Sequence, residues 1–299
     1  MTVRQYASEQ RARRVAVAAL LTGALIWGLI WYPYRILRDA GIDGVVASTA
    51  TYAVALVLGL IVFRQSLSRL TPSWTLLWLA LASAGCNLGY VLATLNGEVM
   101  RVLLLFYLAP LWTVLLARLL LAERLDYSGA CVIALSLAGA ATMLWQPAVG
   151  WPVPHDAADW FGLSAGFSFA LFNVLSRYAE GVSIENKSLI SFAGVVAVGV
   201  ALILAGGAPL PSANSASVWV LLALIGIVLL FVNFVVQYGL ARVAANRAIV
   251  IMLSEVGIAA LSSWLLADEL LGLREWTGGV LIVAASVLSA KMERRETAS

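Results

Sequence analysis

The chain alternates between long apolar runs and short polar connections. A membrane-spanning helix needs roughly 20 mostly apolar residues, and ten runs meet this requirement. They lie at 15–36, 45–63, 74–95, 98–119, 128–145, 160–178, 188–205, 218–240, 246–267 and 276–291. In lipid the backbone has no water to bond with, so each run must form a helix. The pattern predicts an all-α polytopic membrane protein with ten transmembrane helices and no separate soluble domain.

The composition supports this prediction. Of the 299 residues, 62% are hydrophobic and only 12% are charged, and the mean hydropathy is +0.93. Soluble domains are about half apolar and about a quarter charged. These values exclude a water-soluble enzyme, a disordered chain and a nucleic-acid-binding domain. The first run is too long for the apolar core of a signal peptide, which is about 7–15 residues, so we expect it to be retained as the first span.

The basic residues predict the orientation, because Lys and Arg accumulate on the cytoplasmic side of membrane proteins. With the N-terminus inside, fifteen of the 19 basic residues fall on the cytoplasmic side, Lys187 among them. Four fall outside: Arg35, Arg38, Arg101 and Arg274. Both termini are therefore predicted to be cytoplasmic.

Four arginines lie at the ends of predicted spans: Arg35, Arg101, Arg177 and Arg247. We interpret them as anchors that extend their charged heads to the membrane surface. No Lys or Arg falls in the middle of a span, so a deep site for a phosphorylated anion has little support.

An internal repeat relates the two halves of the chain. A shift of 146 residues aligns polar residues of spans 3 and 4 with those of spans 8 and 9: Asn87 with Asn233, Arg101 with Arg247, and Glu123 with Glu269. The predicted halves are 1–148 and 149–299. Because five spans is an odd number, the second half enters from the opposite side of the membrane. Inverted repeats are typical of secondary transporters, in which substrate binds near the midplane between the repeats.

Two segments carry a family resemblance. LAPLWTVLLARLLLAERL (108–125) and LSEVGIAALSSWLLADELL (253–271) resemble the paired hallmark segments of the drug/metabolite transporter superfamily, EamA type. In the first, Pro110 precedes Glu123 by 13 residues; the second keeps Glu269 but has Val256 at the proline position. This difference argues against a symmetric pair of proline kinks. GGVLIVAASVL (278–288) is similar to the glycine-led last helix of the family.

The resemblance implies ten helices and export of small metabolites or drugs from the cytoplasm across a bacterial inner membrane. The segment 98–125, together with the tryptophan-rich first span, resembles the amino-acid exporter branch. It also implies that the substrates include aromatic amino acids.

Glu255 lies about halfway along span 9. A carboxylate at that depth costs at least about 2.5 kcal/mol on insertion scales, so it should face a cavity or a partner. It is a candidate for carrying a proton or for binding the ammonium group of a substrate. The alternative is a neutral glutamic acid that hydrogen-bonds a neighbouring helix for purely structural reasons.

The other candidate cavity residues are amides and aromatic residues at related positions in the two halves. They are Trp27 and Trp31 on span 1, Asn87 and Tyr90 on span 3, Tyr107 on span 4, Phe169 and Asn173 on span 6, and Asn233 and Gln237 on span 8. Amides can accept from an ammonium and donate to a carboxylate, and aromatic faces can hold a cation. The alternatives are hydrogen bonds between helices and ordinary packing. The glycine pairs in GCNLG (85–89) and GLSAG (162–166) predict close helix packing.

Pro33 and Pro110 lie inside spans 1 and 4. Each removes one backbone hydrogen bond and should kink its helix. Such kinks are common hinge points, and they are equally common in static helices.

These observations favour a secondary transporter that exports small zwitterionic metabolites, most of all amino acids including aromatic ones, by alternating access. Its partners would be the substrate, the lipid bilayer and, if transport is coupled, protons. A multidrug exporter of hydrophobic cations is the first alternative, and a non-transporting membrane sensor or scaffold is the second. The chain has no Walker A or HExxH sequence and a single histidine, His155, so we expect no enzyme activity, no metal and no cofactor.

Overall fold

The computed structural model describes residues 3–67, 71–97, 99–144, 154–206, 216–267 and 272–295. Over these residues the fold is all-helical. The helices of the first half are α1 (Val3–Leu29), α2 (Trp31–Asp39), α3 (Gly44–Val62), α4 (Arg64–Leu67), α5 (Trp74–Asn96), α6 (Val99–Phe106), α7 (Ala109–Leu120) and α8 (Tyr127–Leu144). Those of the second half are α9 (Ala157–Tyr178), α10 (Ile184–Gly206), α11 (Ala216–Leu240), α12 (Ala245–Met252), α13 (Ser254–Ala267) and α14 (Leu273–Arg295).

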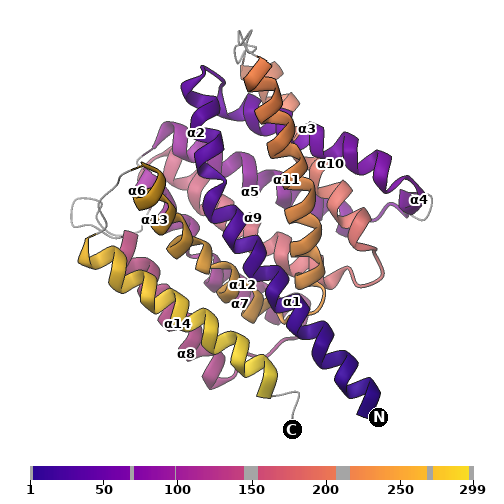
Figure 1. Ribbon diagram of the computed structural model, residues 1–299, viewed down its shortest axis with the longest axis vertical. Coiled ribbons are helices and arrows are strands. Elements are labelled where there is room, and N and C mark those ends of the chain that lie inside the picture. The colour runs from indigo at the N-terminus through magenta and orange to yellow at the C-terminus, as the bar shows by residue number, and fades with distance from the viewer. Residues whose placement is uncertain are drawn as a thin grey trace.

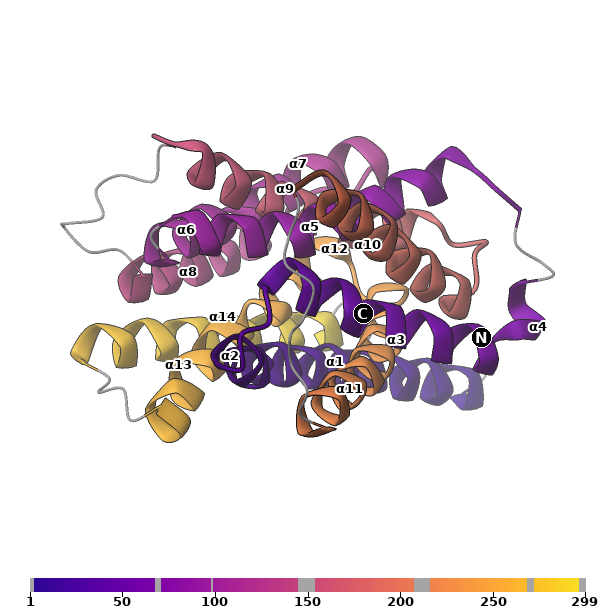
Figure 2. The ribbon, with the colours of Figure 1, turned by 90° about the horizontal axis from the view of Figure 1, so that it is seen from above.

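The helices pack side by side in an elongated bundle, with both chain ends at the lower edge of Figure 1. Seen from above, α1, α11, α13 and α14 form one layer, and α5 to α10 form most of the other (Figure 2). The short helix α12 lies between the two layers (Figure 2). It packs against helices of both layers, including α1, α7 and α14. A segment that contacts both layers is well placed to connect movements of one with movements of the other.

Eight helical segments of the described chain are long and apolar enough to cross a membrane, by length and composition. Two further apolar stretches, Tyr127–Thr142 and Trp276–Ala285, are shorter. Where they are described, the ten predicted runs fall on helix apart from short interruptions at Ile30, Phe63, 107–108 and Leu253, and the count of ten spans stays a prediction. Large apolar side chains cover the outside of the bundle, among them Leu204 (80% exposed), Ile61 (65%) and Leu265 (62%). Such a surface is expected against lipid rather than water.

Three of the predicted spans are broken helices. The first break is at Ile30 between α1 and α2, and the second follows Phe106 between α6 and α7. Pro33 and Pro110 account for these breaks, because neither can donate a backbone N–H to the carbonyl four residues earlier. The carbonyl released by Pro110 is that of Phe106. The predicted kinks are therefore present as breaks in the helices.

The third break, between α12 and α13, has no proline. Here the Ser254 hydroxyl donates to the Ile251 carbonyl oxygen at 2.7 Å. In a regular helix the N–H of Glu255 would donate to this oxygen. The N–H of Val256 bonds the Leu253 carbonyl oxygen three residues back, at 3.1 Å. A side chain that competes for a backbone carbonyl in this way is a known cause of helix distortion.

The helices α6 and α12 end at Phe106 and Met252, which are 146 residues apart. This spacing equals the shift found in the sequence. The second half thus breaks at the corresponding position without a proline, so the two breaks are not a symmetric pair of proline kinks.

The predicted glycine pairs lie at close helix contacts. A methyl group at Gly85 on α5 would lie 2.7 Å from the Ser168 hydroxyl on α9, and one at Gly166 on α9 would lie 2.4 Å from the Phe106 carbonyl oxygen on α6. Only glycine allows two backbones to approach this closely. The Gly166 contact places the α6–α7 break directly against α9.

Candidate functional site

A hydrogen bond joins the α6–α7 break to the α12–α13 break. The Tyr107 hydroxyl donates to Glu255 Oε1 at 3.2 Å. Tyr107 directly follows the last residue of α6, and Glu255 is the second residue of α13. Two residues 148 positions apart in the chain are thus brought together, one from each predicted half.

Aromatic rings surround this bond. The ring of Phe106 lies 5.3 Å from that of Tyr107, 5.4 Å from that of Tyr90 and 5.6 Å from that of Phe169, measured between centroids. Glu255 is half-buried and close enough to Cys86 and Tyr90 to act on both electrostatically. Tyr107 is the hydrogen-bond partner found for its carboxylate among the described residues. A carboxylate beside several aromatic faces is a suitable environment for an organic cation or an ammonium group.

The candidate residues Trp27 and Trp31 of span 1, and the nearby Tyr34, are largely engaged in contacts between helices. Trp31 Nε1 donates to the Ser262 hydroxyl on α13 at 2.9 Å, and Tyr34 shares a 2.7 Å hydrogen bond with Thr51 on α3. The ring of Trp27 is half-buried and packs against the main apolar core. The polar atoms of this stripe thus hold α2 against its neighbours.

The predicted amides differ between the two halves. Asn87 accepts from the Tyr52 hydroxyl at 2.7 Å and donates to the Ser83 carbonyl at 2.9 Å, so both ends of its amide are occupied. In the second half, Asn173 and Gln237 are each 1% exposed. Neither end of either amide has a hydrogen-bond partner among the described residues. The Oδ1 of Asn233, which is 8% exposed, is also unpaired. Buried polar atoms are nearly always paired in proteins, so these three side chains require water or a ligand.

Lys187 was expected to be a charge on the cytoplasmic side, yet it is only 2% exposed. Its Nζ donates to the Ser176 carbonyl oxygen near the end of α9 at 2.5 Å. A cation in this position stabilises a helix C-terminus, where carbonyls are left unpaired. The sequence gives no sign of this burial, because Lys187 directly precedes the predicted span.

Arg177, expected as an anchor at a span end, forms an ion pair. Its Nε donates to Glu123 Oε1 at 2.9 Å and its Nη1 donates to the Val243 carbonyl oxygen at 3.1 Å. The side chains of Arg177 and Glu123 are 27% and 17% exposed. Glu123 carried a signal in the sequence as the residue that closes a hallmark segment, but nothing in the sequence linked it to Arg177, 54 residues away. Its counterpart Glu269 lies outside the described residues, as does the side chain of Arg101.

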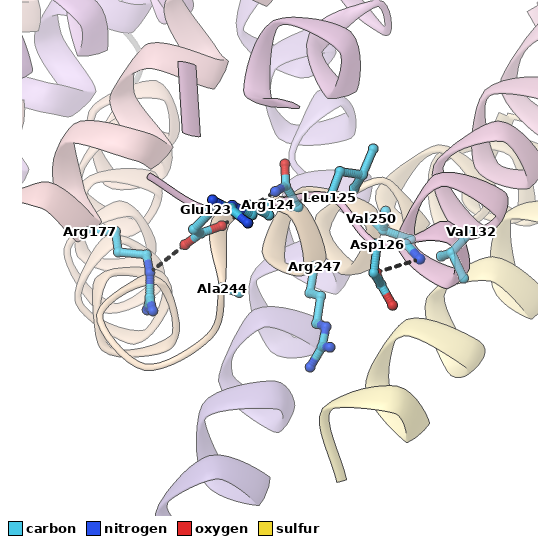
Figure 3. A pocket seen from close by; sticks show the side chains of 11 residues that line it. Glu123, Arg124, Leu125, Asp126, Val132, Arg177, Ala244, Arg247 and Val250 are labelled. Atoms are coloured by element: carbon cyan, nitrogen blue, oxygen red, sulfur yellow. Dashed lines mark hydrogen bonds and ion pairs between the residues drawn. The ribbon is translucent and has the colours of Figure 1, made fainter. Parts of the chain in front are cut away.

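A pocket of about 240 Å³ lies beside the Glu123–Arg177 ion pair (Figure 3). Its lining comes from several segments of the chain and combines charges of both signs. It includes Arg124 and Asp126 from the α7–α8 connection and the neutral Asn246 beside Arg247 from α12. The hydroxyl of Ser128 donates to Asp126 and lowers the pKa of that carboxyl group, helped by the Gly129 N–H and by Arg247. None of these residues was among the predicted site residues, and Arg247 was expected only as an anchor.

Comparison with known proteins identifies the family. The EamA-like transporter family matches residues 14–145 and 156–290. This chain belongs to the EamA-like transporter family. An uncharacterized transporter of Archaeoglobus fulgidus is 28% identical over 222 residues, which cover 73% of this chain and 77% of that protein. A solved crystal structure of another protein has a TM-score of 0.74 and 18% identity, and covers 93% of this chain and 98% of that chain; this likeness shows the fold.

Family membership and the apolar helices together describe a multi-pass membrane protein of a transporter family. The similarity to a transporter, rather than to an enzyme, agrees with the expectation from the sequence.

Proposed function

We propose that this EamA-like transporter exports small zwitterionic metabolites, above all amino acids including aromatic ones, from the cytoplasm of a bacterial cell. The observation that carries the proposal is the Tyr107–Glu255 hydrogen bond, which joins the breaks of two helices. In secondary transporters, broken helices near the middle of the bilayer typically supply the substrate site. The two family matches, 14–145 and 156–290, support the division into repeats at about residue 148.

The chemistry around this bond suits a zwitterion. Glu255 offers a carboxylate to the ammonium group, and Phe106 and Phe169 offer aromatic faces to an apolar or aromatic side chain. Elsewhere in the second half, the unpaired Nδ2 of Asn173 and Nε2 of Gln237 are donors of the kind that a substrate carboxylate requires, and the unpaired Asn233 Oδ1 is an acceptor. A substrate that binds Glu255 competes with the Tyr107 hydroxyl, so binding loosens the link between the two breaks. This competition supports alternating access, in which one half moves against the other.

Counterflow in proteoliposomes tests the substrate class. Labelled phenylalanine and labelled leucine are offered to vesicles loaded with the same unlabelled amino acid, with a lipophilic cation as competitor. Accumulation that other amino acids block supports the proposal. A lipophilic cation that accumulates while amino acids do not would overturn it in favour of the multidrug exporter, which the carboxylate among aromatic rings also suits.

The Glu255→Gln variant tests the site itself. It keeps the size of the side chain and removes its charge, so amino-acid counterflow should fall at least tenfold. Glu180→Gln, at an exposed position, is the matched control and should transport normally. Unchanged counterflow in Glu255→Gln would refute a role of this carboxylate in binding the substrate. Counterflow that survives while uphill export driven by a pH gradient is lost would assign Glu255 to proton transfer instead of ammonium binding.

A further inference from the structure

The carboxylate of Glu123 is held by donors from two other segments of the chain. Arg177 at the end of α9 donates to Oε1 at 2.9 Å. At the start of α12, the Ala245 N–H donates to Oε1 at 3.3 Å and Asn246 Nδ2 donates to Oε2 at 3.4 Å. In Figure 3 Glu123 points toward Arg177. One side chain from the α7–α8 connection thus ties together the ends of α9 and α12.

This donor set is what proteins use to bind carboxylates. A guanidinium group forms strong charge-assisted bonds with carboxylates, and the free N–H groups of a helix N-terminus favour negative charge. The residue that precedes α12, Ala244, has no side chain that can cap the helix. Glu123, more than a hundred residues earlier in the chain, takes the place of a capping group.

Asn246 indicates that the site is built for more than a carboxylate. The residue is 9% exposed, and its Oδ1 has no hydrogen-bond partner although its Nδ2 bonds Glu123. Its side chain lines the pocket of about 240 Å³ beside the ion pair. Oδ1 is an acceptor and requires a donor such as an ammonium group. Glu123 provides the carboxylate and cannot provide the ammonium, whereas a zwitterion provides both.

We infer that Arg177, the N-terminus of α12 and Asn246 form a second binding site for a zwitterionic solute, which Glu123 occupies in this structure and from which the solute displaces it. The solute carboxylate takes the place of the Glu123 carboxylate, and its ammonium group bonds Asn246 Oδ1 from the pocket. The identification of this solute with the transported amino acid rests on the proposed function. The basic residues predict that this end of the molecule faces the cytoplasm, where the exported solute enters.

Displacement has a structural consequence. When a solute replaces Glu123, the donors remain satisfied, but the α7–α8 connection is no longer tied to α9 and α12. The backbone conformation of the residue before Glu123 favours the release of Glu123 from Arg177 and α12. Ala122 has φ 54°, the one positive φ among non-glycine residues of the described chain, and L-residues disfavour that region. Binding at this end therefore opens the contact between the halves without leaving a buried charge unpaired.

Thermal unfolding of the purified full-length protein tests the inference without transport. The Glu123→Ala variant empties the site and should unfold at a lower temperature than the wild type. Added sodium acetate should restore part of the loss, and glycine should restore more, because only glycine also has an ammonium group. Methylammonium chloride should restore none. Glu180→Ala, an exposed glutamate outside the site, is the control and should gain nothing from any of the three.

Two further variants separate binding from a general effect of solutes. Adding Arg177→Gln to Glu123→Ala should abolish the rescue, and adding Asn246→Ala should remove the advantage of glycine over acetate. Equal stabilisation of the wild type, Glu123→Ala and the Arg177→Gln double variant would overturn the inference. If Glu123→Ala does not fold, Glu123→Gln keeps the shape and removes the competing charge. The glycine concentration that gives half of the maximal stabilisation should then be at least tenfold lower than for the wild type. Equal concentrations would overturn the inference.

The outcome does not depend on the transported substrate. The rescue uses acetate and glycine and no vesicle, so it can fail while amino-acid counterflow succeeds. It can also succeed while counterflow fails, in which case the site stands and the substrate class at the central Glu255 is wrong.

Discussion

Replacing Gly166 by alanine should separate α6 from α9 where the α6–α7 break lies. A methyl carbon at Gly166 would lie 2.4 Å from the Phe106 carbonyl oxygen and about 3 Å from its Cα and C, whereas ordinary contacts begin at 3.4 Å. All three atoms belong to the backbone, so no rotamer change relieves the overlap of about 1 Å. Overpacking costs about 1–3 kcal/mol, and alanine gains about 1 kcal/mol over glycine inside a helix. We expect a net loss of about 1 kcal/mol in the free energy of unfolding.

Thermal unfolding of the detergent-purified protein, followed by circular dichroism, measures this loss. Gly279→Ala in α14 is the matched control, because nothing lies within 4 Å of the position of its added methyl group. It should be at least as stable as the wild type. Equal stability of Gly166→Ala and Gly279→Ala would show that the helices do not touch as described, and would refute the reasoning for the position of the α6–α7 break.

Three further substitutions test individual contacts by the same unfolding measurement. Tyr52→Phe leaves Asn87 Oδ1 without its donor and should cost about 1–3 kcal/mol; no loss would mean that water replaces the hydroxyl. Ala122→Gly relieves the positive φ and should stabilise by up to about 1 kcal/mol; a loss would mean that the conformation carries no strain. Ser128→Ala removes the hydrogen bond that lowers the pKa of Asp126, so that pKa should rise. Since the bond stabilises only the charged carboxylate, the stability difference from the wild type should be full above about pH 4 and vanish as the pH falls through the lowered pKa; a constant difference would contradict this.

The positions of the helices could be predicted from the sequence because lipid leaves the backbone few alternatives. Each long apolar run had to satisfy its own N–H and C=O groups, and Pro33 and Pro110 removed one such bond each. The break at Leu253 could not be predicted in the same way. It depends on a serine hydroxyl that competes for the Ile251 carbonyl, and most serines in helices do not break them.

The candidate sites were only partly accessible to sequence reasoning. Glu255 stood out because a carboxylate in mid-span is costly. Tyr107 was also a candidate cavity residue, but nothing in the sequence indicated that it would bond Glu255. The burial of Lys187 and the pairing of Arg177 with Glu123 depend on how helix ends from distant parts of the chain come together. Charge at a span end predicts topology, and it contains no information about which opposite charge lies nearby.

The α6–α7 break and the α12–α13 break differ in whether they can close into a continuous helix. Pro110 has no N–H, so the gap after Phe106 persists in every conformation of the protein. The gap after Met252 contains no proline, and the Ser254 hydroxyl bonds the Ile251 carbonyl oxygen there. If that hydroxyl turns away, the N–H of Glu255 can bond the Ile251 carbonyl, and α12 and α13 become one continuous helix. Straightening would rotate Glu255 about the helix axis and change the position of its carboxylate relative to Tyr107. The half that contains Pro110 would keep its break, whereas the other half could lose it.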